Sequence, residues 1–550
     1  MSEPESAPAP ATAPHPELAP DLALTGGTVV TSLDPPTVVS ADVVIGGGRI
    51  LAVGTAPAGV PRRDCSGALV LPGNVCAHHH LYSALARGMP YRLPPPQNFL
   101  QILQRVWWRL DRALDEPTVR LSALVGGLDA IRAGTTTVVD HHASPDFIDG
   151  SLDVIADALG RLGVRSVLCY EVSDRDGAQR AAAGVAENRR FLAGQQPGGP
   201  GAAFPGGPAT PETGPRSVTA ADRWGARGAA VRYPLSRGLM GAHASFTLSD
   251  ETLAACAEAA ASAGVGVHIH VAEDAADQAD ALAVHGARVM DRLAAAGILG
   301  PGALLAHCIH VTEPEVLDIT AAGATVAHNP RSNMNNRVGY SPLAPARPVA
   351  LGTAGRSNGG SGLGEGGPTG HPGGRVAGGT GPGGPAADSS DGPGHGGSEI
   401  VPRVALGTDG IGGDMIGESQ LGYFRAVEAC AGTGHGWPLA RLAEGARLAG
   451  RCFGEPLLGR VEPGAPADLT VLSYPAPTPL AAGNLAGHWL FGVSSRQVRD
   501  VIVAGELVVA DGRSTRVDEA QVAAEAARET ARLWQRLEQL EPHPFSPKGG

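Results

Sequence analysis

The chain has 550 residues, of which 43% are hydrophobic and 17% are charged, so it can bury a core far larger than that of one small domain. Its formal net charge of −12 argues against a nucleic-acid or anionic-membrane partner. Its only lysine is Lys548, which excludes both a P-loop and a Schiff-base mechanism, because each needs a lysine inside the fold.

The N-terminal residues and the cysteines indicate the cellular compartment of the protein. Residues 1–21 are rich in Pro and Ala and have neither a basic nor an apolar signal region, which predicts a flexible tail. There is no run of about 18 apolar residues, so we expect no membrane span. Seven scattered cysteines without a CxxC pair are typical of a reduced protein. We therefore expect a cytoplasmic protein.

Short strands separated by Gly turns occupy residues 22–71, and similar strands return in 467–473 and 498–513. Two strand-rich segments thus flank a long middle. We predict one small β domain built from 22–71 and 455–515, with residues 72–454 as a separate domain.

The middle alternates apolar strand patterns with helical ones. Strand–helix alternation predicts an α/β fold with a parallel sheet, which could be open or closed. The predicted strands cover 135–142, 164–172, 266–274, 303–310, 324–330 and 404–410. After the second β segment, residues 516–540 predict an amphipathic helix with Asp518 near its start.

Two segments of the middle are too polar and too rich in Gly and Pro to pack. Residues 195–217 and 351–400 cannot bury enough apolar surface to offset the entropy of ordering. We expect flexible insertions there and assign them no catalytic or binding role.

Histidines gather where predicted strands end. His78 and His80 follow an apolar run, and residues i and i+2 of a strand face the same way, so the two side chains can converge on one ion. An exposed polar turn would explain the run His78-His79-His80 equally well.

His268 and His270 repeat this spacing, and Glu273 follows three residues later. The carboxylate is placed to move a proton while His270 holds a metal. The alternative is a buried histidine pair beside a surface acid.

His307 and Asp409 end two further predicted strands. A carboxylate at the end of an apolar strand is costly to bury unless it pairs or binds a cation, although Asp409 could also cap a helix. Catalytic residues of α/β barrels lie at the carboxyl ends of strands, so ionisable residues at several strand ends favour an active site.

The pattern resembles the amidohydrolase superfamily, in the branch that holds guanine deaminases, adenosine-type deaminases and triazine chlorohydrolases. The resemblance spans about residues 22–515 and implies a (β/α)8 TIM-type barrel with a small β-sandwich domain built from both chain ends. The matching segments are LVLPGNVCAHHHLYSALARG, GAHASFT, HIHVAED, LLAHCIH, AHNPRSNMNN and ALGTDG.

The resemblance also implies roles for single residues. His78, His80, His270 and Asp409 would hold the metal, and Glu273 would be the general base and acid. His307 would contact the water or the substrate, and Asp409 would orient the water. His243 corresponds to a position that faces substrate, and Tyr82, Arg87, Gln97 and Asn333 are further candidates to line the pocket. We interpret Trp107 and Trp108 as helix packing.

The relatives imply one divalent metal ion, Zn²⁺ or else Fe²⁺, because binuclear branches use a carboxylated lysine that this chain lacks. We expect a metal-dependent hydrolase of non-peptide carbon–nitrogen bonds, an aminohydrolase or deaminase of an amino-substituted heterocycle. The alternatives are a ring-opening cyclic amidohydrolase and an inactive metal-binding scaffold. A small-molecule substrate and a homodimer follow from the resemblance.

Overall fold

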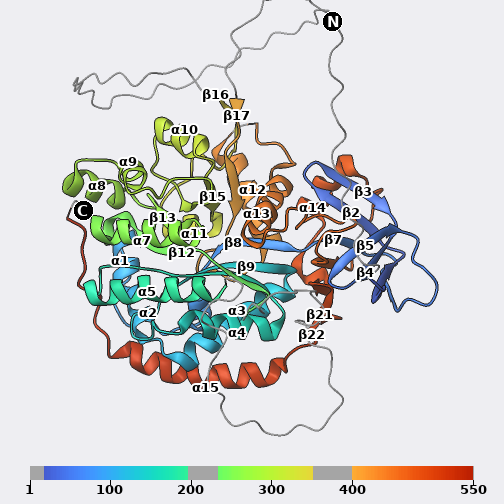
Figure 1. Ribbon diagram of the computed structural model, residues 1–550, viewed down its shortest axis with the longest axis horizontal. Coiled ribbons are helices and arrows are strands. Elements are labelled where there is room, and N and C mark those ends of the chain that lie inside the picture. Colours follow the sequence, from blue (N-terminus) through green and yellow to red (C-terminus); the bar gives the residue numbers. More distant parts are fainter. Residues whose placement is uncertain (1–17, 196–232, 351–398, 431, 549–550) are drawn as a thin grey trace, which may run out of the picture.

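The computed structural model describes residues 18–195, 233–350, 399–430 and 432–548 (Figure 1). The predicted N-terminal tail (1–21) lies mostly outside these residues, and the two predicted insertions (195–217 and 351–400) lie almost entirely outside them. None of the described helices is both long and apolar enough to cross a membrane.

A ring of parallel strands forms the centre of the described structure. In spatial order the strands are β8 (Asn74–His79), β9 (Thr135–His142), β10 (Arg165–Tyr170), β12 (Met240–Ala244), β13 (Val267–Val271), β14 (Leu304–His307), β15 (Thr325–His328) and β18 (Arg403–Leu406). Single parallel bridges, between Val172 and Ala242 and between His79 and Asp409, join the two halves of the ring. The predicted TIM-type barrel is therefore confirmed.

The barrel strands are apolar because they are covered on both faces. Every residue of β8, β9 and β10 is buried, as expected for parallel strands with a packed interior and an outer layer of helices. The sequence pattern did not predict β12 as a strand. Its residues are MGAHA, and Gly and Ala have low strand propensity, so only pairing with its neighbour β13 makes this segment extended.

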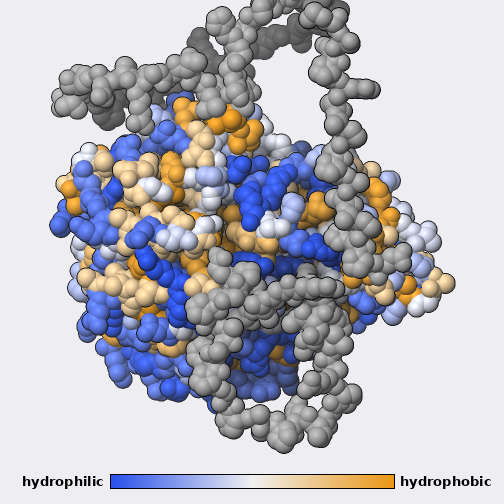
Figure 2. All heavy atoms as spheres, viewed as in Figure 1, coloured by the Kyte–Doolittle hydropathy of each residue, from blue (hydrophilic) through white to orange (hydrophobic). Residues whose placement is uncertain are grey.

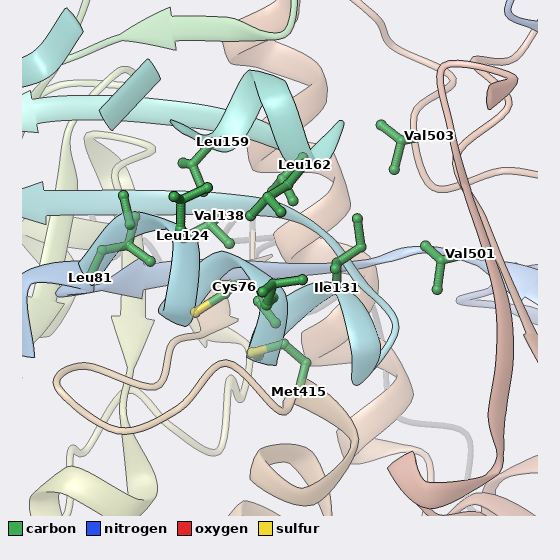
Figure 3. Packing of buried hydrophobic residues seen from close by; sticks show 14 of the residues in the cluster. Cys76, Leu81, Leu124, Ile131, Val138, Leu159, Leu162, Met415, Val501 and Val503 are labelled. Atoms are coloured by element: carbon green, nitrogen blue, oxygen red, sulfur yellow. The ribbon is translucent and has the colours of Figure 1, made fainter. Parts of the chain in front are cut away.

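Helices cover the outside of the barrel. On one side α3 (Glu116–Arg132) and α4 (Ser151–Leu162) press Leu124, Leu159 and Leu162 together over Val138 of β9 (Figure 3). A Cβ at Gly127 would lie 2.7 Å from the side chains of Leu159 and Leu162, so both leucines would have to shift to accommodate a larger residue. The other covering helices are α5 (Ala178–Gly194), α7 (Asp250–Ala263), α8 (Ala275–His285), α9 (Val289–Ala295), α10 (Glu313–Ala321), α11 (Pro330–Asn336), α12 (Met415–Ala429) and α13 (Trp437–Phe453).

Strands from both ends of the chain share one sheet beside the barrel. Its order is β22-β21-β20-β19-β7-β2-β3, which places Leu69–Pro72 (β7) against Leu469–Leu472 (β19). The other members are β2 (Thr28–Leu33), β3 (Pro36–Ser40), β20 (Val498–Val503), β21 (Glu506–Ala510) and β22 (Arg513–Ser514). A second sheet contains β1 (Leu22–Thr25), β4 (Asp42–Gly46), β5 (Arg49–Gly54) and β6 (Arg62–Asp64).

The two sheets share one apolar cluster, in which Val43 and Ile45 of β4 meet Leu469 and Val471 of β19. We propose that the sheets form the predicted β domain, whose bounds stay a prediction. A buried ion pair joins them to the barrel, since Arg165 on β10 donates to Asp468, just before β19.

The C-terminal helix α15 (Glu519–Glu538) runs along the outside of α3 and α2 (Trp108–Ala113), with Asp518 accepting hydrogen bonds from its first turn. Figure 2 shows hydrophilic residues over this edge of the molecule. Residues 541–548, which we call the C-terminal strap, then pass across the barrel end. Backbone amides of the strap donate to Gln104 from His543 and to Asp280 from Lys548.

The remaining described elements are short. They are η1 (Leu81–Ala86), α1 (Phe99–Ile102), η2 (Leu103–Trp107), β11 (Ser236–Gly238), η4 (Ser245–Thr247), β16 (Val349–Ala350), β17 (Glu399–Ile400), η5 (Ala482–Asn484), α14 (Leu485–Phe491) and η6 (Ser495–Gln497).

Candidate metal centre and active-site pocket

Four side chains predicted as metal ligands meet at the carboxyl ends of three strands. Oδ1 of Asp409 lies 3.2 Å from Nε2 of His78 and 3.0 Å from Nε2 of His80. Nε2 of His270 lies 3.2 Å from Nε2 of His80. All four donor atoms lie within 4.8 Å of one another, and the three imidazoles are buried. The structure thus brings together the donors that the sequence placed on separate strands.

Hydrogen bonds at the opposite ring nitrogens orient these imidazoles. Nδ1 of His80 is 2.5 Å from the carbonyl oxygen of His141, and Nδ1 of His270 is 2.8 Å from that of His243. Because carbonyl oxygens only accept, both Nδ1 atoms carry a proton, and in the neutral rings both Nε2 atoms present lone pairs. Two lone pairs 3.2 Å apart repel unless a cation or a proton lies between them. This donor set therefore fits a divalent metal ion.

The pKa values of these groups suit metal binding. Burial lowers the pKa of His78 to about 3 and that of His270 well below its usual range, so both rings are neutral. Burial also opposes the charged form of His80, but the carboxylate of Asp409 outweighs it and raises that pKa to about 9. A proton thus competes with a metal ion for the space between His80 and Asp409.

Strained backbone accompanies the site. Ala272, His307 and Asp409 all adopt positive φ angles, of 45°, 70° and 53° respectively. Residues other than glycine rarely adopt this conformation, which costs of order 1–3 kcal/mol and is concentrated at functional sites. The strain lies where β13, β14 and β18 turn into their loops, next to the residues predicted to carry the chemistry.

Glu273 and His307 lie together on the other side of Asp409. Oε2 of Glu273 is 3.5 Å from Nε2 of His307, and Asn336 donates to Oε1 of Glu273 at 3.2 Å. Burial raises the pKa of Glu273 to about 7, which is the range a group needs to accept and return a proton at neutral pH. Nδ1 of His307 bonds Oδ1 of Asn333 at 2.8 Å, so Asn333 orients this imidazole.

One pocket opens onto these groups. Tyr82 and His243, both predicted to face substrate, lie in its wall together with Glu273 and Asp409. The wall also contains aromatic side chains, which sequence reasoning had assigned to helix packing or not considered. The lining residues that carry this part of the wall are Phe99, Trp107, Trp108 and Phe246.

Three predicted substrate contacts do not line this pocket, and one of them, Asn333, bonds His307 instead. Arg87 is 65% exposed in its side chain and pairs with Asp129. Gln97 is exposed and donates to the carbonyl oxygen of Pro95 within its own loop. Both follow the first ligand pair in sequence, but the loop after β8 leads away from the site. His79 also points away from the donor cluster, and its Nδ1 lies 2.8 Å from Oγ1 of Thr408.

Sequence reasoning missed Glu171, which follows β10 directly and lines the pocket. The signal was present, because an acid closes an apolar strand here just as Asp409 does after β18. Trp107 and Trp108 were recognised as packing residues, yet they also form the pocket wall. Only the path of the connection between β8 and β9 reveals this.

Comparison with known proteins places the chain in a family. Residues 69–369 match the amidohydrolase family model. The 5-methylthioadenosine/S-adenosylhomocysteine deaminase of Nitratidesulfovibrio vulgaris strain Hildenborough is 29% identical over 94% of this chain and 97% of its own length. The 8-oxoguanine deaminase of Pseudomonas aeruginosa is 30% identical over 58% of this chain and 67% of its own length.

Solved structures agree on the fold. An adenosine deaminase from Xanthomonas campestris with bound zinc matches with a TM-score of 0.66 and 21% identity, over 96% of this chain and 100% of its own. An atrazine chlorohydrolase from Arthrobacter aurescens, also complexed with zinc, matches with a TM-score of 0.65 and 19% identity, over 92% of this chain and 100% of its own. Barrel, donor set and family match agree, and the chain belongs to the amidohydrolase family.

Proposed function

We propose that the protein is a metal-dependent hydrolase of carbon–nitrogen bonds that removes an amino group from a heterocycle. The observation that carries this is a four-donor cluster that shares Asp409 with a second group, Glu273 and His307. His80, His270, Glu273 and Asp409 of these groups line one pocket. The deaminases among its relatives act on adenosine-type and guanine-type compounds, which supports the same reaction class here.

His78, His80, His270 and Asp409 would hold one divalent ion, and we propose zinc, as bound in the two structural neighbours. Bound there, such an ion would acidify a water molecule and polarise the carbon that the water attacks. A mononuclear site is supported by the lysine content, because Lys548 lies in the C-terminal strap.

Glu273 would move the protons. Its carboxylate accepts a proton as the water oxygen bonds to the ring carbon, and returns it to the exocyclic nitrogen. The carbon–nitrogen bond then breaks and ammonia leaves. His307, whose Nδ1 donates to Oδ1 of Asn333, would contact through Nε2 the oxygen on which charge develops. Tyr82 and His243 would contact the ring.

We also propose a cytoplasmic homodimer. All seven cysteines are free thiols, as a reducing compartment favours. Phe424 on α12 and Phe491 on α14 are 49% and 68% exposed and lie with ring centroids 6.2 Å apart, an apolar surface that a second copy could cover. The molecular mass in solution tests this.

Ammonia release tests the proposed reaction. The protein is stripped with a chelator, reloaded with one equivalent of zinc, and assayed with adenosine-type, guanine-type and triazine amines. We expect ammonia from at least one class, only in the reloaded protein, and about one ion per chain by elemental analysis. Two tight ions would contradict the mononuclear site. Hydrolysis of a cyclic amide such as dihydrouracil, with no ammonia from any amine, would overturn the deaminase assignment.

A further inference from the structure

The pocket contains a second buried carboxylate that the proposed proton transfers do not use. Glu171 is 5% exposed and lies at the pocket surface. One of its carboxylate oxygens is within 4.8 Å of a ring nitrogen of His80, and the same holds for His270. Any ring whose carbon reacts beside these two histidines therefore lies against Glu171.

Glu171 is held rigidly from behind. Arg175 donates from Nη1 to Oε1 of Glu171 at 2.9 Å and from Nη2 to Oδ2 of Asp111 at 2.5 Å. The guanidinium also lies 5.4 Å from the ring centroid of Trp108. A guanidinium in this position repels a second metal ion, so the carboxylate is better suited to bind a ligand than to hold a metal.

The other oxygen of Glu171 has no aligned donor in the described part of the chain. Oε2 lies 3.3 Å from Nδ1 of His141, but the two atoms are not aligned as a hydrogen bond. Nε2 of His141 faces the carbonyl oxygen of His268 at 3.2 Å and supplies that proton. A carboxylate oxygen has two lone pairs, so Oε2 can still accept a hydrogen bond from a ligand in the pocket.

The charge of the pocket wall further limits the class of ligand that can bind. The lining residues include five carboxylates and no lysine or arginine; the carboxylates are Glu171, Glu273, Asp274, Asp277 and Asp409. A phosphate or carboxylate on the substrate would find no positive partner here and would be repelled. Trp108 and Phe246 offer flat apolar surface, which favours an uncharged aromatic ring.

We propose that Glu171 accepts a hydrogen bond from a ring N–H next to the amino-bearing carbon, which makes the substrate an uncharged 2-amino-4-oxo heterocycle of the guanine type. In an adenine-type ring the ring nitrogen next to the amino-bearing carbon carries no hydrogen, and its lone pair would face the carboxylate. This inference rests on the proposed deaminase function, since that function places the reacting carbon beside His80 and His270.

Binding of three small probes to the zinc-loaded protein tests the proposal by calorimetry. The probes are 2-aminopyrimidin-4-one, its N3-methyl derivative, which lacks the ring N–H, and 4-aminopyrimidine, which has only bare ring nitrogens. We expect the first probe to bind at least tenfold more tightly than either of the others, because a hydrogen bond to a charged acceptor typically contributes a factor of ten or more.

Glu171→Gln separates recognition from metal binding. The amide is nearly isosteric and can turn its NH₂ group toward the ligand, so the preference for the N–H probe should fall below threefold while zinc content stays at one per chain. Glu187→Gln is the matched control. Glu187 is also buried and paired with an arginine, Arg190, but lies on α5 away from the pocket, so its loss should leave the preference intact.

The outcomes distinguish the two proposals. Loss of zinc in Glu171→Gln would make Glu171 a ligand and overturn the inference, as would an unchanged probe preference. Efficient deamination of 4-aminopyrimidine with no dependence on Glu171 would support the deaminase function and contradict the proposed guanine-type substrate class. If no amine is hydrolysed but the probe preference depends on Glu171, the recognition role stands and the deaminase function fails.

Discussion

At the scale of single residues, His270 and Glu273 lie three positions apart but have different proposed roles. His270 has its Nδ1 proton committed to the carbonyl oxygen of His243, which turns Nε2 toward His78, His80 and Asp409. Glu273 lies beyond the strand end, beside His307 and Asn336. The first side chain belongs to the donor cluster, and the second lies beside it where a reacting water would be.

Substitution at these two positions should therefore have different effects. His270→Ala removes a nitrogen donor, and we expect it to lose both zinc and activity. Glu273→Gln removes no donor from the cluster, so it should keep zinc and the fold while turnover falls by about 10²–10⁴-fold, the usual contribution of a positioned general acid/base. Elemental analysis and ammonia assays on both variants measure this. Zinc lost from Glu273→Gln but retained in His270→Ala would reverse the two roles.

At the scale of elements, the C-terminal strap supports the aromatic wall of the pocket. The ring of Phe545 lies 5.7 Å from that of Trp108 and 6.3 Å from that of Phe246, centroid to centroid. Nε2 of His543 lies 3.3 Å from Asp176, the residue that follows Arg175. The strap therefore contacts both the wall and the neighbour of the arginine that holds Glu171.

Removal of residues 541–550 should weaken substrate binding more than chemistry. We expect KM to rise at least about tenfold with zinc content unchanged, because aromatic contacts of this kind each contribute about 0.5–1.5 kcal/mol beyond the area they bury. Phe545→Ala should show part of the same increase in KM. Lys548→Ala is the control, since only the backbone amide of Lys548 bonds Asp280. A truncated protein with wild-type KM would show that the strap does not support the wall.

At the scale of the whole molecule, buried neutral histidines couple stability to pH. Burial lowers the pKa of His142 and of His328 to about 3 in the folded protein. An unfolded chain protonates its histidines near pH 6.5, so between pH 6.5 and about 3 the unfolded state binds more protons than the folded state. The stability that these groups contribute is complete above pH 6.5 and is lost as the pH falls.

His328 offers a test, because it is fully buried and neither of its ring nitrogens has a hydrogen-bond partner among the described residues. Each such histidine steepens the loss of stability by at most about 1.4 kcal/mol per pH unit below pH 6.5. The melting temperature of His328→Leu should therefore fall less than that of the wild type between pH 7 and pH 5. Melting curves of both proteins across that range measure the difference. Parallel curves would show that His328 does not titrate on unfolding.

The sequence predicted those features that short patterns determine. His78, His80, His270 and Asp409 each lie at the end of an apolar run, and parallel strands bring such ends together, so the donor cluster followed from the pattern and the family resemblance. The pattern could not find β12, whose residues favour a strand only beside β13. It also could not place Arg87, Gln97 or Glu171 relative to the pocket, because their positions depend on the paths of loops that are set by tertiary contacts.

The position of the strap along the chain bears on how the site assembles during translation. His78 and His80 emerge from the ribosome early, the donor cluster is complete once Asp409 has followed, and Phe545 comes more than a hundred residues later. Chains fold from the N-terminal side as they are made. The nascent barrel therefore passes through a stage in which all four donors are present but Phe545 does not yet pack against the aromatic wall. A metal ion can enter the site at that stage, before the pocket is complete.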